Sequence, residues 1–162
     1  MMHDAMGPGS FRRVFVVFSG HNFRAVIALC RFFSQAQAPF VIAASGVSDP
    51  IFLTRYAERV VHVRSDSTVT VDLFARIAGA CPAVPVYVPT TEFINWFVLS
   101  QRSSLEALGW VIGLPTADLY HRLTAKRESQ EIFNGLAGLE VLPELKPEQW
   151  TPPFVVKPSQ NL

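Results

Sequence analysis

The sequence has few of the features that mark a membrane protein, a secreted protein or a nucleic-acid-binding protein. Its apolar runs, such as 14–18 and 40–44, are far shorter than the roughly 18 residues that a membrane-spanning helix needs. The apolar run after Arg12 and Arg13 is about five residues long, too short for the core of a signal peptide. The net charge of +1 provides no general attraction to nucleic acid. These absences predict a cytoplasmic protein with no membrane and no nucleic-acid partner.

Cysteine is also scarce, with one residue at position 30 and one at position 81. Cys30 and Cys81 lie far apart in the sequence and have no metal-ligand spacing, and both have apolar neighbours. We expect buried free thiols, with a disulfide or a reactive cysteine as the alternatives. The chain shows no other metal motif, so no metal ligands are predicted.

Glycine is missing where a dinucleotide site would need it. The turn after the first expected strand reads Ser19-Gly20-His21-Asn22, whereas the dinucleotide fingerprint is G-x-G-x-x-G. No Walker A sequence is present. The second expected strand ends in Ala44-Ser45-Gly46, with no acidic residue for a ribose. A nicotinamide-dependent enzyme is therefore disfavoured.

Apolar residues make up 49% of the 162 residues and charged residues 17%, which favours a packed core over disorder. Short β-branched and aromatic runs alternate with segments of helical periodicity. Strands are expected at 14–18, 40–45, 60–63 and 84–88, with a shorter one at 109–114. Asp49-Pro50 predicts the start of a short helix that runs to about Glu58. This alternation predicts an α/β fold with a Rossmann-like parallel sheet of about four to five strands. We expect a leader over 1–10, the Rossmann-like domain over 11–115, and the start of another domain over 116–162.

Lysine is rare, with three residues against eleven arginines. Lys126 lies at the start of an expected helix, 125–135, which we expect Thr124 to cap. A linker with four prolines follows over 143–153. The last expected element is a short strand, Phe154-Val155-Val156-Lys157-Pro158, with Lys157 near its end.

This order of elements resembles the front of the ATP-grasp ligases, closest to the carboxylate–amine ligase and carbamoyl-phosphate-synthase-like branch. The resemblance implies that the first domain is a pre-ATP-grasp domain and that 116–162 begins the ATP-grasp domain. It also implies that Lys126 and Lys157 reach the phosphates of ATP. Implied partners are a small-molecule carboxylate and an amine, with ATP and Mg²⁺ in the full-length parent. A homodimer is compatible with this architecture.

The chain departs from the family pattern in two places. Ala125 stands where an acidic residue usually precedes the first lysine, and only five residues follow Lys157. The family's Gly-rich loop, adenine pocket and Mg²⁺ ligands would lie further along a longer chain. The sequence therefore looks truncated. We expect residues 1–162 alone to have no ATPase activity and no bound ATP.

Substrate contacts are expected at the carboxyl edge of the sheet, where ligands collect in open α/β folds. The candidates follow the first and fourth strands: Ser19, Gly20, His21, Asn22, Thr90, Thr91 and Glu92. Turn formation and helix capping explain the same residues without a ligand. The alternative function is a stand-alone Rossmann-like module that binds or dimerises without catalysis.

Overall fold

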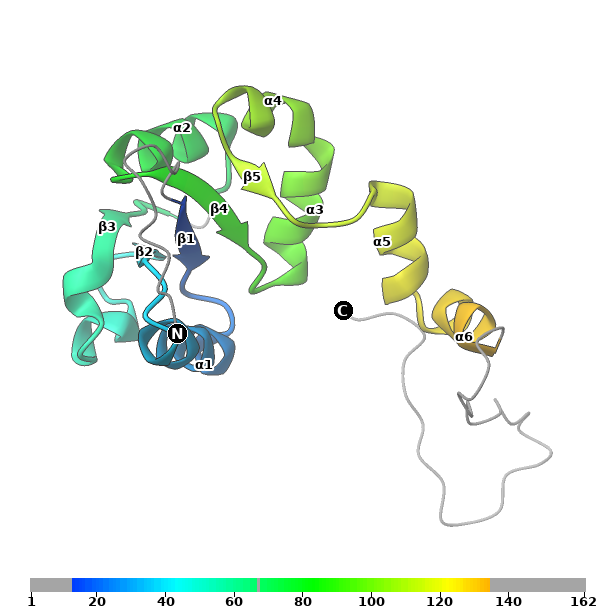
Figure 1. Ribbon diagram of the computed structural model, residues 1–162, viewed down its shortest axis with the longest axis horizontal. Helices are drawn as coiled ribbons and strands as arrows, with labels where there is room; N and C mark the ends of the chain where they lie inside the picture. Colours follow the sequence, from blue (N-terminus) through cyan, green and yellow to red (C-terminus); the bar gives the residue numbers. More distant parts are fainter. Residues whose placement is uncertain (1–12, 67, 135–162) are drawn as a thin grey trace, which may run out of the picture. The chain divides into compact units, whose positions relative to one another are not determined.

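A computed structural model of the chain describes residues 13–66 and 68–134 (Figure 1). The chain divides into two compact units, with the division between Leu114 and Pro115. The strands of the first unit are β1 (Arg13–Phe18), β2 (Phe40–Ala44), β3 (Val60–Val63), β4 (Val84–Val88) and β5 (Val111–Ile112). Its helices are α1 (Phe23–Gln35), η1 (Pro50–Leu53), η2 (Ala57–Arg59), α2 (Val71–Ala80), α3 (Glu92–Ser100) and α4 (Arg102–Ala107).

The five strands form one parallel sheet in the order β3-β2-β1-β4-β5. This confirms the prediction of an α/β fold with a Rossmann-like parallel sheet. The strand order reverses between β1 and β4, because the chain first builds outward from β1 to β3 and then crosses to β4. In open parallel sheets such a reversal opens a crevice at the carboxyl ends of the two strands.

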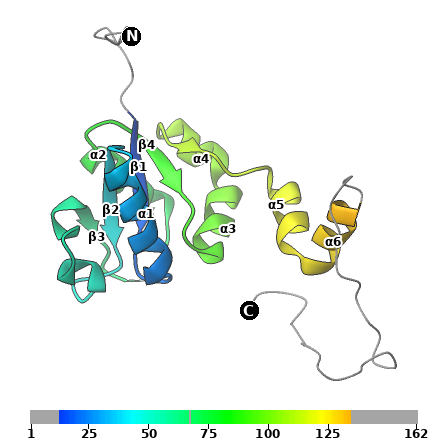
Figure 2. The same cartoon turned by 60° about the horizontal axis from the view of Figure 1, so that its bottom comes forward.

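Alternate residues of β1 supply both halves of the hydrophobic core. Val14, Val16 and Phe18 pack with α2, α3 and α4 on one face of the sheet. Phe15 and Val17 pack with α1 and η1 on the other face. Figures 1 and 2 show this three-layer arrangement, with the central strand covered on both sides. The uninterrupted apolar run that predicted this strand is thus explained by burial on both faces.

Polar caps fix the starts of the helices that follow the strands. The Asn22 side chain accepts a hydrogen bond from the Ala25 N–H at the start of α1. Thr70 and Thr91 do the same at the starts of α2 and α3. Each cap satisfies a backbone donor that has no partner within its helix.

The structure corrects three details of the predicted elements. The single short helix expected after Asp49 is two 3₁₀ helices, η1 and η2. The fifth strand comprises only Val111–Ile112 of the expected 109–114, and it pairs with β4 alone. Thr124 belongs to the end of the preceding helix, where its hydroxyl donates to the carbonyl oxygens of Tyr120 and His121. The prediction that it caps the next helix is therefore wrong.

The described part of the second unit consists of α5 (Ala117–Thr124) and α6 (Lys126–Asn134), which lie against each other. Thr116 caps α5 by accepting from the Leu119 N–H. Lys126 is the first residue of α6, as expected for a lysine at a helix start. The predicted strand 154–158 lies outside the described residues. No helix of the described part is long and apolar enough to cross a bilayer.

Candidate functional site

The two segments predicted to contact substrate meet where the strand order reverses. Val17 of β1 pairs with Val88 of β4, so both strands end at the same edge. The Thr90 hydroxyl, just after β4, donates to the carbonyl oxygen of Phe18 over 3.1 Å. The rings of His21 and Phe93 lie 5.9 Å apart and connect the start of α1 with that of α3. The fold therefore brings these residues together at the carboxyl edge of the sheet, where β1 and β4 end side by side.

The seven candidate substrate residues separate into buried and accessible groups. Ser19 and Thr90 are buried and hydrogen-bonded within the protein. Thr91 caps α3, and Glu92 lies in the first turn of that helix. The exposed candidates are Gly20, His21 and Asn22. His21 is thus the candidate side chain most available to a ligand, since the Asn22 side chain is committed to capping α1.

Asp49 organises the ends of β1 and β2, a role that was not predicted from the sequence. Its carboxylate is 3% exposed and accepts four hydrogen bonds. The donors are the Ser19 hydroxyl, the Ser45 N–H, the Ser45 hydroxyl and the Ile51 N–H, at 2.8–2.9 Å. Burial raises the pKa of Asp49, but the hydrogen bonds from Ser45, Ile51 and Ser19 outweigh it, so the pKa lies below its ordinary value. The sequence signal, Asp49-Pro50, indicated only a helix cap.

Arg64, the residue after β3, is a second buried charged residue that sequence reasoning missed. It is 3% exposed, and its Nη2 donates to the carbonyl oxygen of Ser19 over 2.8 Å. Its Nε and Nη1 are buried without a hydrogen-bond partner. Burial lowers the pKa of Arg64, and the charges of Asp49 and Asp66 oppose this shift. A buried guanidinium with unused donors is unusual enough to require an explanation.

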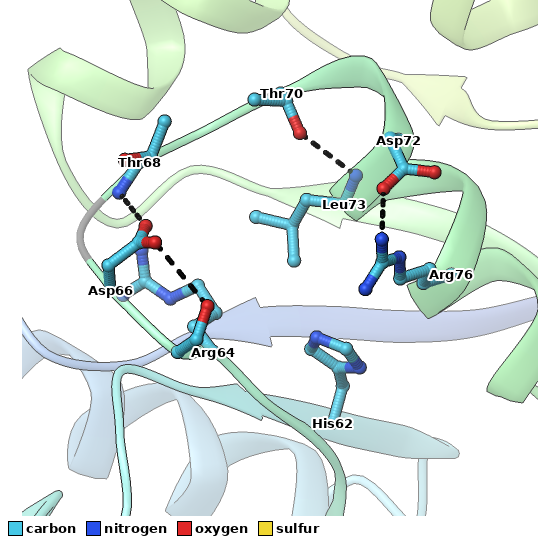
Figure 3. Close-up of a pocket in the computed structure, with 9 residues that line it drawn as sticks. His62, Arg64, Asp66, Thr68, Thr70, Asp72, Leu73 and Arg76 are labelled. Carbon is cyan, nitrogen blue, oxygen red and sulfur yellow. Dashed lines mark hydrogen bonds and ion pairs between the residues drawn. The ribbon is translucent and has the colours of Figure 1, made fainter.

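A cavity of about 230 Å³ lies beside Arg64, between the end of β3 and the start of α2. Figure 3 shows His62 and Arg76 at this cavity, with Asp66 on the other side. Burial, followed by the charges of Arg76 and Arg64, lowers the pKa of His62. Of the described residues, no three His, Cys, Asp or Glu are grouped so that they could hold a metal ion.

Of the two predicted nucleotide lysines, Lys126 begins α6 in the second unit, and Lys157 lies outside the described residues. Comparison of the chain with protein-family models, with curated proteins and with solved structures gave no match.

Proposed function

We propose that this chain is the front portion of an ATP-dependent ligase that activates a carboxylate as an acyl phosphate for attack by an amine. The observation that supports this most is the meeting of the two predicted substrate segments. Phe18 and Thr90 are 72 positions apart in the sequence, yet they are hydrogen-bonded at the point where the strand order reverses. This is the place where Rossmann-like sheets bind small molecules.

In this proposal the Rossmann-like unit shapes the substrate pocket. His21 is exposed next to Phe93, so the pair can contact a small substrate at the crevice. Lys126 and Lys157 would neutralise the phosphate oxygens as the γ-phosphoryl group passes to the carboxylate. The carboxylate oxygen bonds to phosphorus and ADP leaves. The amine then bonds to the acyl carbon, and inorganic phosphate departs with that carboxylate oxygen.

ATP and Mg²⁺ would supply the phosphoryl group and part of its charge neutralisation. Among the described residues, no three His, Cys, Asp or Glu side chains are grouped to hold Mg²⁺, so none is assigned as a ligand. The nucleotide contacts of Lys126 and Lys157 follow from the resemblance of segment 124–159 to the ATP-grasp ligases.

Replacing Lys157 with alanine tests the nucleotide role. In the natural gene product we expect Lys157→Ala to lower the rate of carboxylate-dependent ADP release about 100-fold, the effect of losing one phosphate-stabilising donor. Lys146→Ala is the matched control, since it removes another of the three lysines at a position with no proposed role. ADP release should be followed with a panel of carboxylates and amines. Equal rates for the two variants would contradict the assignment.

Exposed apolar side chains favour a second candidate function, a module that binds a second copy of the chain. Val47 is 90% exposed and Leu53 is 92% exposed, and both lie between β2 and β3. Exposed apolar patches often mark protein interfaces, and we propose that these two side chains belong to one such patch. A dimer that buries Leu53 would gain about 1.5–3 kcal/mol from that side chain.

Under this second candidate, Leu53→Glu weakens dimerisation at least tenfold, because a buried leucine is replaced by a charge. Sedimentation velocity over a concentration series measures the dissociation constant. Glu58→Ala, in the neighbouring η2, is the control and should leave it unchanged. A wild-type chain that stays monomeric at all concentrations would exclude this candidate.

A further inference from the structure

Every polar group of Ser19 is hydrogen-bonded to a residue in or after β2 or β3. Its N–H donates to the carbonyl oxygen of Ala43 over 2.9 Å. Its hydroxyl donates to the Asp49 carboxylate over 2.9 Å, and its carbonyl oxygen accepts from Nη2 of Arg64 over 2.8 Å. Ser19 is also completely buried. It therefore anchors the exposed turn that follows it rather than contacting a ligand itself.

Among these partners, Arg64 reaches Ser19 from the most distant strand. Arg64 follows β3 and Ser19 follows β1, with β2 between the two strands. Neighbouring strands lie about 4.8 Å apart, so the side chain must bridge two strand spacings, roughly 10 Å. Arginine and lysine are the long side chains that end in hydrogen-bond donors. A Cβ atom built on Gly20 would lie 3.2 Å from the Arg64 Nη2, so the guanidinium lies close against the turn.

The turn that Arg64 holds carries predicted substrate residues. Residues 20–22 are exposed at the carboxyl edge of the sheet, where ligands collect in open parallel sheets. The ring of His21 lies 5.9 Å from that of Phe93. We propose that Arg64 is a positioning residue, which holds Ser19 so that the turn presents His21 to the small-molecule carboxylate. The substrate part of this inference rests on the proposed ligase function, whereas the anchoring of the turn does not.

The burial of Arg64 favours a positioning role over a stabilising one. The residue is 3% exposed, and its Nε and Nη1 have no hydrogen-bond partner in the described part of the chain. Burying a charge whose donors are only partly paired opposes folding. Apolar side chains of similar size often replace buried charged groups without loss of stability. A residue with this cost is expected where its hydrogen bond serves a function, here the placement of the turn.

Amide hydrogen exchange of residues 1–162, measured by NMR, tests the anchoring without any ligand. In Arg64→Met, an apolar side chain of similar length replaces the guanidinium. We expect the Ser19 N–H to exchange about tenfold faster than in the wild type, because the turn opens locally. The Phe15 N–H, which donates to the carbonyl oxygen of Pro39, should exchange at the wild-type rate. The melting temperature should change by no more than a few degrees.

Two further variants make the exchange result specific to Arg64. Arg64→Lys keeps the charge and a terminal donor, so the Ser19 N–H should exchange more slowly than in Arg64→Met. Arg31→Met removes an exposed arginine of α1 and should leave the exchange of the Ser19 N–H unchanged. If Arg64→Met does not fold, or if the Phe15 and Ser19 amides exchange faster together, Arg64 stabilises the whole unit and the proposal is wrong. An unchanged Ser19 N–H would also overturn it.

Carboxylate-dependent ADP release by the natural gene product tests the substrate part. We expect Arg64→Met to raise the KM for the carboxylate about tenfold and to leave the KM for ATP unchanged, because the turn contacts only the carboxylate. Arg64→Lys should give an intermediate KM. An unchanged KM for the carboxylate would show that the turn does not position it. If no carboxylate supports ADP release, the ligase function and the substrate part are both wrong, and the exchange rates alone decide the anchoring role.

Discussion

Replacing Gly20 with alanine is expected to destabilise the protein by about 3 kcal/mol. Gly20 has a φ of +116°, a conformation that a residue with a side chain adopts only at a cost. A Cβ atom there would lie 2.2 Å from the Ser45 Cβ and 3.2 Å from the Arg64 Nη2. The ends of β1 and β2 would therefore have to move apart. Urea denaturation followed by tryptophan fluorescence measures the change in the free energy of unfolding.

Gly79 provides a matched control for this substitution. It is exposed in α2, and a Cβ built on it would meet nothing within 4 Å. Gly79→Ala should stabilise the protein by about 0.5–1 kcal/mol, because alanine loses less conformational entropy in a helix than glycine does. If the Gly20→Ala variant is as stable as the wild type, the turn after β1 does not lie as close to Ser45 as the structure shows.

Replacing Asp49 with asparagine is expected to cost about 3 kcal/mol at pH 7, because four donors lose a charged acceptor. An amide cannot accept all four hydrogen bonds, and its NH₂ group would face other donors. The exposed Asp118, in the first turn of α5, provides the control. Asp118→Asn should change the free energy of unfolding by less than about 0.5 kcal/mol.

The effect of Asp49 should also depend on pH in a defined direction. The pKa of Asp49 is lower in the folded protein than the value of about 3.9 that is usual in an unfolded chain. Its contribution to stability is therefore complete above about pH 5 and declines as the pH falls through the folded-state pKa. The stability difference between wild type and Asp49→Asn should stay constant from about pH 5 to 7 and shrink below about pH 4. A difference that grows on acidification would contradict the hydrogen-bonding scheme.

The parallel sheet could be predicted because its strands are continuous apolar runs. Val14–Phe18 is buried on both faces, and such a strand shows its burial directly in its composition. The helix starts could also be predicted, because the Asn22 and Thr91 side chains accept hydrogen bonds from backbone N–H groups only three residues away. Local interactions of this kind leave a signature in the sequence.

The polar network at the carboxyl edge could not be predicted, because it is built from distant residues. The Ser19–Asp49 hydrogen bond spans 30 positions and the Arg64–Ser19 bond spans 45. An arginine at a strand end is normally exposed, so nothing local indicates that Arg64 is buried. Asp49 also precedes Pro50, a local pattern that indicates a helix cap. Its hydrogen bond to the distant Ser19 is therefore not apparent from the sequence. The conformation of Gly20 follows from the same packing.

The fate of the carboxylate oxygen tests the proposed ligase function most directly. A carboxylate that supports ADP release by the natural gene product would be prepared with ¹⁸O in both oxygens and incubated with ATP and the amine. An acyl phosphate mechanism predicts one ¹⁸O atom in each inorganic phosphate released, detected by the isotope shift in its ³¹P NMR signal. Inorganic phosphate without ¹⁸O, formed together with the ligated product, would contradict activation of the carboxylate as an acyl phosphate.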